Sequence, residues 1–257
     1  MLKPRNCTLD QTSHRYYWDP QGARIPMRVS VTGVTNWGTD KSVYDAYPDA
    51  APRGTHVHRC MEALARDNMD AQSIKRRLAA GEIEAGSCPP ENLLQFLDND
   101  GHISPEGIDC GDWFHQLQFG KINDKGMTMK DFWSEAEVLA CEFTMVSQKR
   151  SLGGQLDLLV KFRGSTLLVD LKTKSASYSG SSKKDRAGYA AQAGGYLWLM
   201  DEGDGAKDER PPYVEKCRTL IVTPEKVDWL TPMDPTDCAM QWEEAWGAYS
   251  AASLVCF

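Results

Sequence analysis

The sequence has no long apolar run and no pair of closely spaced cysteines. No stretch approaches the roughly 18 apolar residues that a membrane-spanning helix needs, and the N-terminal run MLKPRNCTLDQ has no apolar core of the secretory type. We therefore expect an intracellular, cytoplasmic protein without a membrane partner. Its eight cysteines are never closer than 18 residues, so the chain offers no C-x-x-C pair for zinc or redox chemistry and no four-cysteine iron–sulfur cluster.

Positive charge is also scarce overall, since the formal net charge is −7. An acidic protein is a poor general partner for a polyanion. The basic residues are concentrated, however: the stretch from Lys149 to Arg186 has nine Lys or Arg against three acidic residues, so it carries +6 and the remainder −13. This distribution is typical of a protein that holds a polyanion in one place only.

The apolar patterns predict one α/β domain with a mixed central sheet flanked by helices. The expected elements are an extended segment over 16–37 with a turn at 19–22, a helix opening near Gly54-Thr55, a helix over Ser73–Ala80, strands over 138–147, 154–162, 165–174 and 217–224, and helices over 183–200 and 241–253. The acidic run at Asp98–Gly101 lacks the ligand spacing of an EF-hand, so we expect a surface loop there.

Two neighbouring strands contain the residues that indicate chemistry. Asp170 and Lys172 are two apart and therefore share a face of their strand. Alone, such a pair is often only a half-buried ion pair at a sheet edge. A two-residue type II′ turn at Gly164-Ser165 would place Asp157 of the preceding strand on that same face, opposite Lys172. A three-residue loop would place Asp157 on the other face.

Two converging carboxylates repel each other unless a cation lies between them. Hard oxygen ligands with incomplete protein coordination suit Mg²⁺ or Mn²⁺. Such a metal lowers the pKa of a bound water and stabilises charge on a phosphoryl group, and a lysine beside it can orient the attacking water. This combination indicates phosphodiester hydrolysis.

The runs GGQLDLLV, VDLKTK and QAGGY, together with the upstream GTHVH, resemble the RecB-like and phage exonuclease branch of the PD-(D/E)XK nuclease superfamily, which includes a mitochondrial genome maintenance exonuclease. The resemblance implies a restriction-endonuclease-like core over 1–257. Its expected parts are an N-terminal β segment (1–50), a helical part (51–130), a catalytic core (131–225) and a C-terminal helix (226–257).

The resemblance also implies roles for individual residues. The implied catalytic residues are Asp157, Asp170, Lys172, Gln192 and Tyr196. The implied metal ligands are His58, Asp157, Asp170, the backbone carbonyl of Leu171 and Glu142. His56 competes with His58, and Glu142 could instead orient Lys172 or a helix.

The helix with Gln192 and the loop before it are the expected DNA-binding region. The expected contacts are Lys174, Lys183, Lys184, Arg186 and Tyr189, although Tyr189 could equally pack in the core. The loop over 173–183 lacks apolar anchors, so we expect it to be mobile without DNA. Gly188, Gly194 and Gly195 weaken the helix, which a close approach of the sheet or of the DNA backbone would explain.

These observations predict a Mg²⁺- or Mn²⁺-dependent deoxyribonuclease. The resemblance further implies an exonuclease that acts on single- or double-stranded DNA ends in phage-type recombination, replication or repair, with a single-strand-annealing or replication protein as a partner. An endonuclease of the same superfamily and a non-catalytic DNA-binding protein that keeps the fold remain the alternatives.

Overall fold

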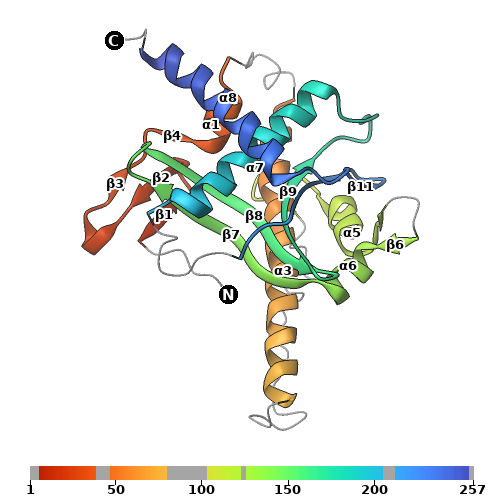
Figure 1. The fold of residues 1–257 in the computed structure, drawn as a ribbon. Helices are drawn as coiled ribbons and strands as arrows, with labels where there is room; N and C mark the ends of the chain where they lie inside the picture. Colours follow the sequence, from red (N-terminus) through yellow and green to blue (C-terminus); the bar gives the residue numbers. More distant parts are fainter. Residues whose placement is uncertain (1–5, 39–46, 80–102, 123–125, 205–211, 255–257) are drawn as a thin grey trace.

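A mixed eight-stranded sheet forms the centre of the computed structural model, which describes residues 6–38, 47–79, 103–122, 126–204 and 212–254 (Figure 1). The strand order is β4-β8-β9-β10-β11-β5-β6, and β7 pairs with the other edge of β8. The strands are β4 (Val29–Ser30), β5 (Lys121–Ile122), β6 (Met127–Thr128), β7 (Glu137–Ser147), β8 (Leu152–Phe162), β9 (Ser165–Thr173), β10 (Lys216–Val222) and β11 (Val227–Trp229). Because β8 and β9 are antiparallel whereas β9 and β10 are parallel, the expected mixed sheet is confirmed.

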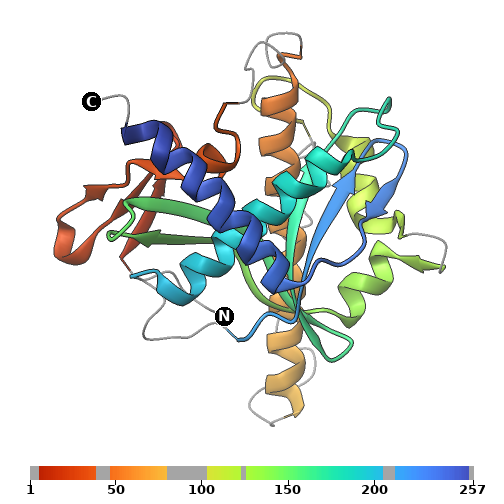
Figure 2. The same cartoon turned by 45° about the horizontal axis from the view of Figure 1, so that its top comes forward.

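Helices cover both faces of this sheet, and Figures 1 and 2 agree on their places. One face carries α1 (Val31–Thr35), α7 (Lys183–Glu202) and α8 (Pro235–Leu254), and the other carries α3 (Ala50–Ala79), α5 (Gly111–Phe119) and α6 (Met129–Glu135). Each face has its own apolar cluster. Burial on both faces explains why the central strands read as nearly continuous apolar runs. Within the described ranges, no helix has the length and apolarity to cross a membrane.

The N-terminal region forms a separate three-stranded antiparallel sheet of β1 (Cys7–Asp10), β2 (Arg15–Trp18) and β3 (Ile25–Pro26). It lies against β8, where Tyr16 packs so closely on Gly153 that a Cβ there would be 2.3 Å from the Tyr16 Cβ. The 3-10 helix Pro20–Gly22 accounts for the expected turn.

Two expectations for this half of the chain are wrong. The end of the supposed extended segment is helix α1, because Ser30 caps it by accepting a hydrogen bond from the Gly33 N–H (2.9 Å) and its valines are buried against α7 and α8. The two helices expected after residue 50 are one helix, α3, which begins at Ala50 rather than near Gly54. Val57, Met61 and Leu64 give this helix an apolar stripe, and all three are buried. Ala80 and the loop Asp98–Gly101 lie outside the described residues.

The β8–β9 hairpin turns at Arg163-Gly164, one residue earlier than predicted. Both residues have positive φ (49° and 82°), which is a type I′ rather than a type II′ turn. Arg163 is held there by a bidentate ion pair with Glu135 (2.6 and 2.8 Å). Phe162 therefore pairs with Ser165, and the ladder ends at Leu158–Val169, so Asp157 is not paired with Lys172. A shift of two residues keeps every side chain on its predicted face of β9.

The glycines of α7 have a different cause from the one expected. A Cβ on Gly194 would lie 2.0 Å from the Cys238 carbonyl oxygen, and a Cβ on Gly195 would meet Val31 and Trp242. The close neighbours are therefore α8 and α1, neither the sheet nor a DNA backbone. Gly188 has no atom within 4 Å of its Cβ position.

Candidate active site

Asp157 lies in a fork of the sheet. One edge of β8 pairs with β9 over Leu158–Phe162 and with β4 at Leu152–Gly153, so the segment between has no strand beside it on that edge. The Asp157 carboxylate takes the place of a strand carbonyl there, because its Oδ2 accepts a hydrogen bond from the Leu171 N–H (2.6 Å).

The alternation of both neighbouring strands breaks at this point. Leu156 and Leu158 belong to opposite apolar clusters, although residues two apart in a regular strand share a face. Regular alternation would place both on one face, so β8 departs from it at Asp157. On β7, Glu142 stands opposite Asp157 and has a φ of 44°, in the left-handed region. Both carboxylates consequently leave the two cores and face a cleft.

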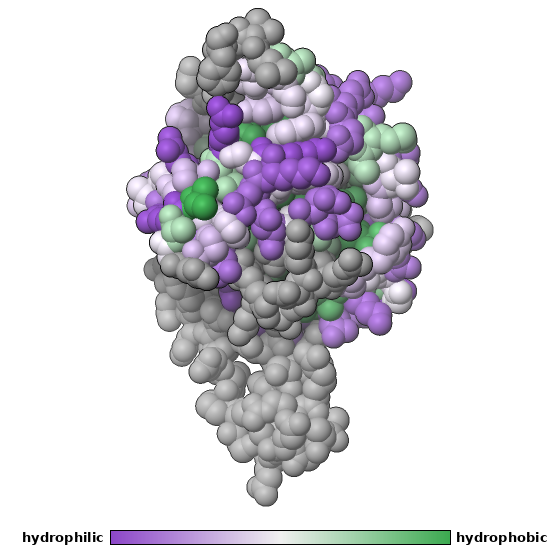
Figure 3. Space-filling model, turned by 60° about the vertical axis from the view of Figure 1, so that its left-hand side comes forward, coloured by the Kyte–Doolittle hydropathy of each residue, from purple (hydrophilic) through white to green (hydrophobic). Residues whose placement is uncertain are grey.

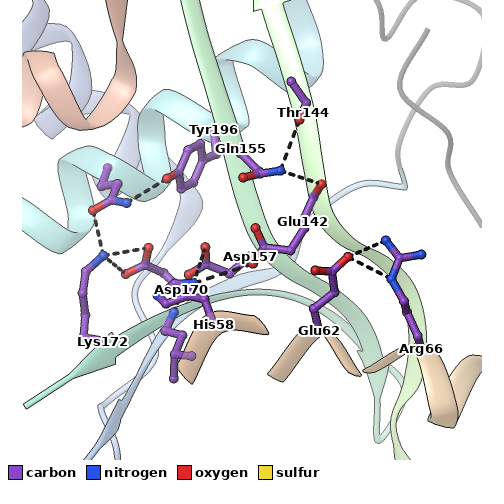
Figure 4. Close-up of polar contacts among 12 residues, drawn as sticks. His58, Glu62, Arg66, Glu142, Thr144, Gln155, Asp157, Asp170, Lys172 and Tyr196 are labelled. Carbon is purple, nitrogen blue, oxygen red and sulfur yellow. Dashed lines mark hydrogen bonds and ion pairs between the residues drawn. The ribbon is translucent and has the colours of Figure 1, made fainter. Parts of the chain in front are cut away.

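Three side chains from three elements meet in this cleft (Figure 4). His58 of α3, Glu142 of β7 and Asp157 of β8 each offer one ligand atom, and these atoms lie within 4.8 Å of one another. The His58 Nδ1 is 3.4 Å from Asp157 Oδ1 and 3.6 Å from Glu142 Oε1. Of the two candidate histidines, His58 joins this cluster, whereas His56 is buried beside a neighbouring hollow.

This donor set fits a divalent cation. One imidazole nitrogen and two carboxylate oxygens suit a metal that completes its coordination with water. The Glu142 Oε1 supports this fit, since it is buried and accepts no hydrogen bond from the part of the chain that the structure describes. The backbone carbonyl of Leu171, the further ligand that the resemblance implies, belongs to the residue whose N–H donates a hydrogen bond to Asp157.

Asp170 points to Lys172 instead of joining the three-residue cluster. The Lys172 Nζ is 2.8 and 3.0 Å from the two carboxylate oxygens, and it donates a further hydrogen bond to the Gln192 Oε1 (3.0 Å). The Gln192 Nε2 in turn donates to the Tyr196 hydroxyl (2.7 Å). Gln192 and Tyr196, four residues apart on α7, thus hold the lysine from the helix side.

Three carboxylates share the positive charges of His58 and Lys172, and this arrangement shifts the pKa values of the site. Burial would lower the pKa of His58, but the carboxylates of Asp157 and Glu142 outweigh it and raise this pKa to about 10. Burial raises the pKa of Glu142 to about 7 and, against the effect of Lys172, that of Asp170 to about 6. Burial also acts to raise the pKa of Asp157, yet His58 and Lys172 keep it below its ordinary value. A cation would stabilise all three carboxylates.

The predicted DNA-binding residues lie at the start of α7. Lys183, Lys184 and Arg186 are exposed and Lys174 is half-buried, and a capping box of Ser182 and Asp185 begins the helix. Tyr189 is buried, with its ring centre 5.8 Å from the Lys172 Nζ.

The loop before α7 has an apolar anchor that the sequence analysis missed. Tyr178 packs against Tyr189, Ile221 and Leu230, and its hydroxyl is 2.7 Å from the Ser181 Oγ. The premise of a loop without anchors is therefore wrong.

Two further residues of the site were also missed. Tyr16 of the N-terminal sheet lines the cleft with the metal-ligand cluster, and Gln155 donates a hydrogen bond to the backbone carbonyl of Glu142 (3.0 Å). Gln155 stands inside the quoted GGQLD run but has no recognisable role there. Only the packing of β2 on β8 brings Tyr16 to the site.

A sequence profile of the PD-(D/E)XK nuclease superfamily matches residues 37–232. The chain belongs to the PD-(D/E)XK nuclease superfamily. The match covers α3, the β8–β9 hairpin and α7, so it contains every cleft residue discussed above except Tyr16. PD-(D/E)XK nucleases use divalent metals, in agreement with the donor set of the cluster.

Comparison with individual proteins adds little to the superfamily assignment. The chain matches none of the curated proteins. Among solved structures it is similar to one described as "Crystal structure of SSO0001", with 15% sequence identity and a TM-score of 0.27, over 76% of this chain and 74% of that chain.

Proposed function

We propose that this PD-(D/E)XK nuclease is a Mg²⁺- or Mn²⁺-dependent deoxyribonuclease that acts on DNA ends as an exonuclease. The observation that carries the proposal is the meeting of His58, Glu142 and Asp157 directly beside the Asp170–Lys172 pair. A histidine and carboxylates for a metal, next to a lysine for water or phosphate, match the needs of phosphodiester hydrolysis.

In this proposal His58, Glu142 and Asp157 hold the metal, with Asp170 and the Leu171 carbonyl as further ligands. When bound, the metal supplies a Lewis acid and a water of lowered pKa. Lys172 orients the attacking water and offsets charge that develops on the phosphate. Gln192 fixes the lysine through its 3.0 Å hydrogen bond, and Tyr196 fixes Gln192.

The proposed DNA grip uses Lys174, Lys183, Lys184 and Arg186, because these cations lie on the segment that leaves the catalytic strand β9 and starts α7. Tyr189 contributes by packing beside Lys172, since its side chain is buried. The exonuclease activity, the role in phage-type recombination, replication or repair, and an annealing or replication protein as partner rest on the motif resemblance.

The test uses linear and covalently closed DNA, each single- and double-stranded, with Mg²⁺, with Mn²⁺ and with EDTA. We expect linear DNA to be degraded from its ends with either metal and to survive in EDTA. Asp157→Asn should lose all cleavage while it stays folded, because the amide oxygen can still accept from Leu171 but a ligand charge is gone. Cleavage of closed circles would support the endonuclease alternative. A parent protein that binds DNA yet cuts none would support the non-catalytic one.

A further inference from the structure

Three hollows join at the active site. The cleft around His58 and Asp157 has a volume of about 490 Å³. It shares His14 and Tyr16 with a hollow of about 400 Å³ beside the N-terminal sheet, and it shares His14 and Arg59 with one of about 320 Å³ beside α3. His14 lines all three, so the hollows form one continuous groove around this residue.

Charge changes sign along this groove. The hollow beside the N-terminal sheet is lined by His14, Arg15 and Arg28 and has no acidic side chain in its lining. The exposed Arg59 of α3 lines both the cleft and the hollow beside α3, where Glu106 is the one acidic side chain of the described lining. Figure 3 shows that hydrophilic side chains predominate on the face that carries the N-terminal sheet. Arginines in the hollows that join an acidic centre suit a chain of phosphates that passes this centre.

From this arrangement we propose that a single, unpaired DNA strand lies in the groove, held by Arg15 and Arg28 in the hollow beside the N-terminal sheet and by Arg59 where the cleft meets the hollow beside α3. The inference rests on the proposed nuclease function. The ligand side chains are recessed, with only 9% of Asp157 and 17% of Glu142 exposed. An unpaired strand can bend one phosphodiester down to them. Its bases can stack on aromatic side chains such as Tyr16 and His14, as is usual in single-strand grooves.

The experiment measures DNA binding in EDTA, where no cleavage occurs, over a range of salt concentrations. The variant Arg15→Ala/Arg28→Ala should bind a single strand about 10-fold more weakly, with a salt slope lower by about 1.4, and should lose less affinity for a blunt duplex. The matched control is Arg24→Ala on the same sheet, whose guanidinium is paired with Asp10 (3.1 Å); it should bind as the parent does.

If the double arginine variant keeps its affinity for a single strand, or loses as much affinity for the blunt duplex, the proposal that the groove holds a single strand is wrong. Cleavage by the parent in Mg²⁺ is scored separately. A parent that binds single strands through these arginines but cuts none would refute the nuclease function and leave the groove intact.

A second inference concerns the backbone of Glu142. Its φ of 44° is rare for a residue with a Cβ. Cys141 and Phe143, on either side of it, belong to opposite apolar clusters, so the left-handed residue breaks the alternation of β7. This break turns the Glu142 carboxylate out of both cores and towards His58.

We infer that Gln155 is the positioning residue that holds Glu142 in this conformation. The β7–β8 ladder pairs Cys141 with Leu158 and Phe143 with Leu156 and leaves out the position between them. The Gln155 Nε2 supplies a hydrogen bond to the Glu142 carbonyl (3.0 Å) and contacts the Thr144 Oγ1 (3.3 Å), as Figure 4 shows. Mutation of a residue that orients a metal ligand without touching the metal typically changes the metal affinity about 10- to 100-fold.

The test variant Gln155→Met keeps the volume and removes the donor. Calorimetry with Mn²⁺ and no DNA should show affinity about 10-fold or more below that of the parent, and NMR shifts of the Glu142 backbone should leave the left-handed range. The control Thr144→Val removes only the second acceptor and should match the parent in both measurements. A left-handed Glu142 in Gln155→Met would overturn the inference. If the parent itself binds no Mn²⁺, the metal site fails, while the NMR result still decides the role of Gln155.

Discussion

The Lys172 ammonium is hydrogen-bonded to the buried Asp170 carboxylate and to the Gln192 side-chain amide. Asp170, its partner, is 1% exposed, and removal of one member of a buried pair leaves the other charge without compensation. Lys172→Met should therefore lower the free energy of unfolding by about 3 kcal/mol, measured by urea denaturation. The double variant Asp170→Asn/Lys172→Met should recover most of that loss, because neither member of the pair then carries an uncompensated charge. Equal urea midpoints for the parent and Lys172→Met would show that the pair does not stabilise the fold.

The same lysine allows catalysis and metal binding to be separated. Lys172→Met should reduce the rate of cleavage by roughly 10²-fold or more. Mn²⁺ affinity should be kept or rise, because the ammonium touches none of the three clustered ligand atoms and its loss removes a positive charge beside Asp170, the proposed further ligand. A parallel loss of metal affinity in calorimetry would instead make Lys172 an organiser of the metal site.

At the residue scale, the spacing of Asp170 and Lys172 was sufficient to predict their shared face, since strand alternation fixes it. Asp157 reaches the same cleft by a route that parity does not give, because the alternation of β8 breaks at this residue and its carboxylate accepts from the Leu171 N–H. Glu142 could be named but not oriented: a left-handed residue inside a strand has no sequence signal when the residue is not glycine. Gln155 acts on that backbone and was invisible for the same reason.

Helix α7 carries Gln192 and Tyr196 and packs closely on α8 at Gly194 and Gly195, whereas Gly188 of the same helix has open space around it. Gly194→Ala should destabilise the protein, because its Cβ would meet the Cys238 carbonyl at 2.0 Å and backbone cannot give way cheaply. Gly188→Ala is the matched control in the same helix. With open space around it, it should raise stability by about 0.5–1 kcal/mol. Thermal unfolding of both variants checks the contrast, and a neutral Gly194→Ala would mean that α8 packs more loosely on α7.

Long elements were predicted better than short ones. The four central strands follow from their apolar runs, and α7 lies close to the expected 183–200. In contrast, α1 begins in a β-branched run, and its helical state depends on the Ser30 cap and on burial of Val31 and Val34 against α7 and α8. Such tertiary contacts override local preference, and no pattern within the segment reveals them.

Over the whole molecule, an acidic protein must concentrate its cations where DNA lies. Changing Lys183, Lys184 and Arg186 together to alanine should weaken binding to all DNA sequences and lower the salt slope by about two to three. Cleavage at saturating DNA should fall much less. Lys121→Ala/Lys130→Ala, on β5 and α6 at the far edge of the sheet, is the control. If affinity and salt slope stay at parent values, the start of α7 is not part of the DNA path, and the arginines of the N-terminal groove become the main candidates.

The place of the N-terminal sheet could not be predicted, although the superfamily and the centre of the site could. Its strands pair mainly with one another, and their contact with β8 depends on the absence of a side chain at Gly153. The organisation of the whole chain as one nuclease domain stays a prediction.

The hydrogen bond from the Leu171 amide to Asp157 gives the protein a built-in spectroscopic reporter. Most protected amides in a sheet exchange slowly with solvent because a strand carbonyl holds them, whereas this proton is held by an ionised side chain at the cleft. Its chemical shift should follow the charge on Asp157 and therefore move when Mg²⁺ is added, while the amides of Leu167 and Val169, deeper in the sheet, stay in place. Asp157→Ala should speed its exchange with deuterium without affecting those neighbours. One resonance can thus monitor the site during folding, titration or screening without any substrate.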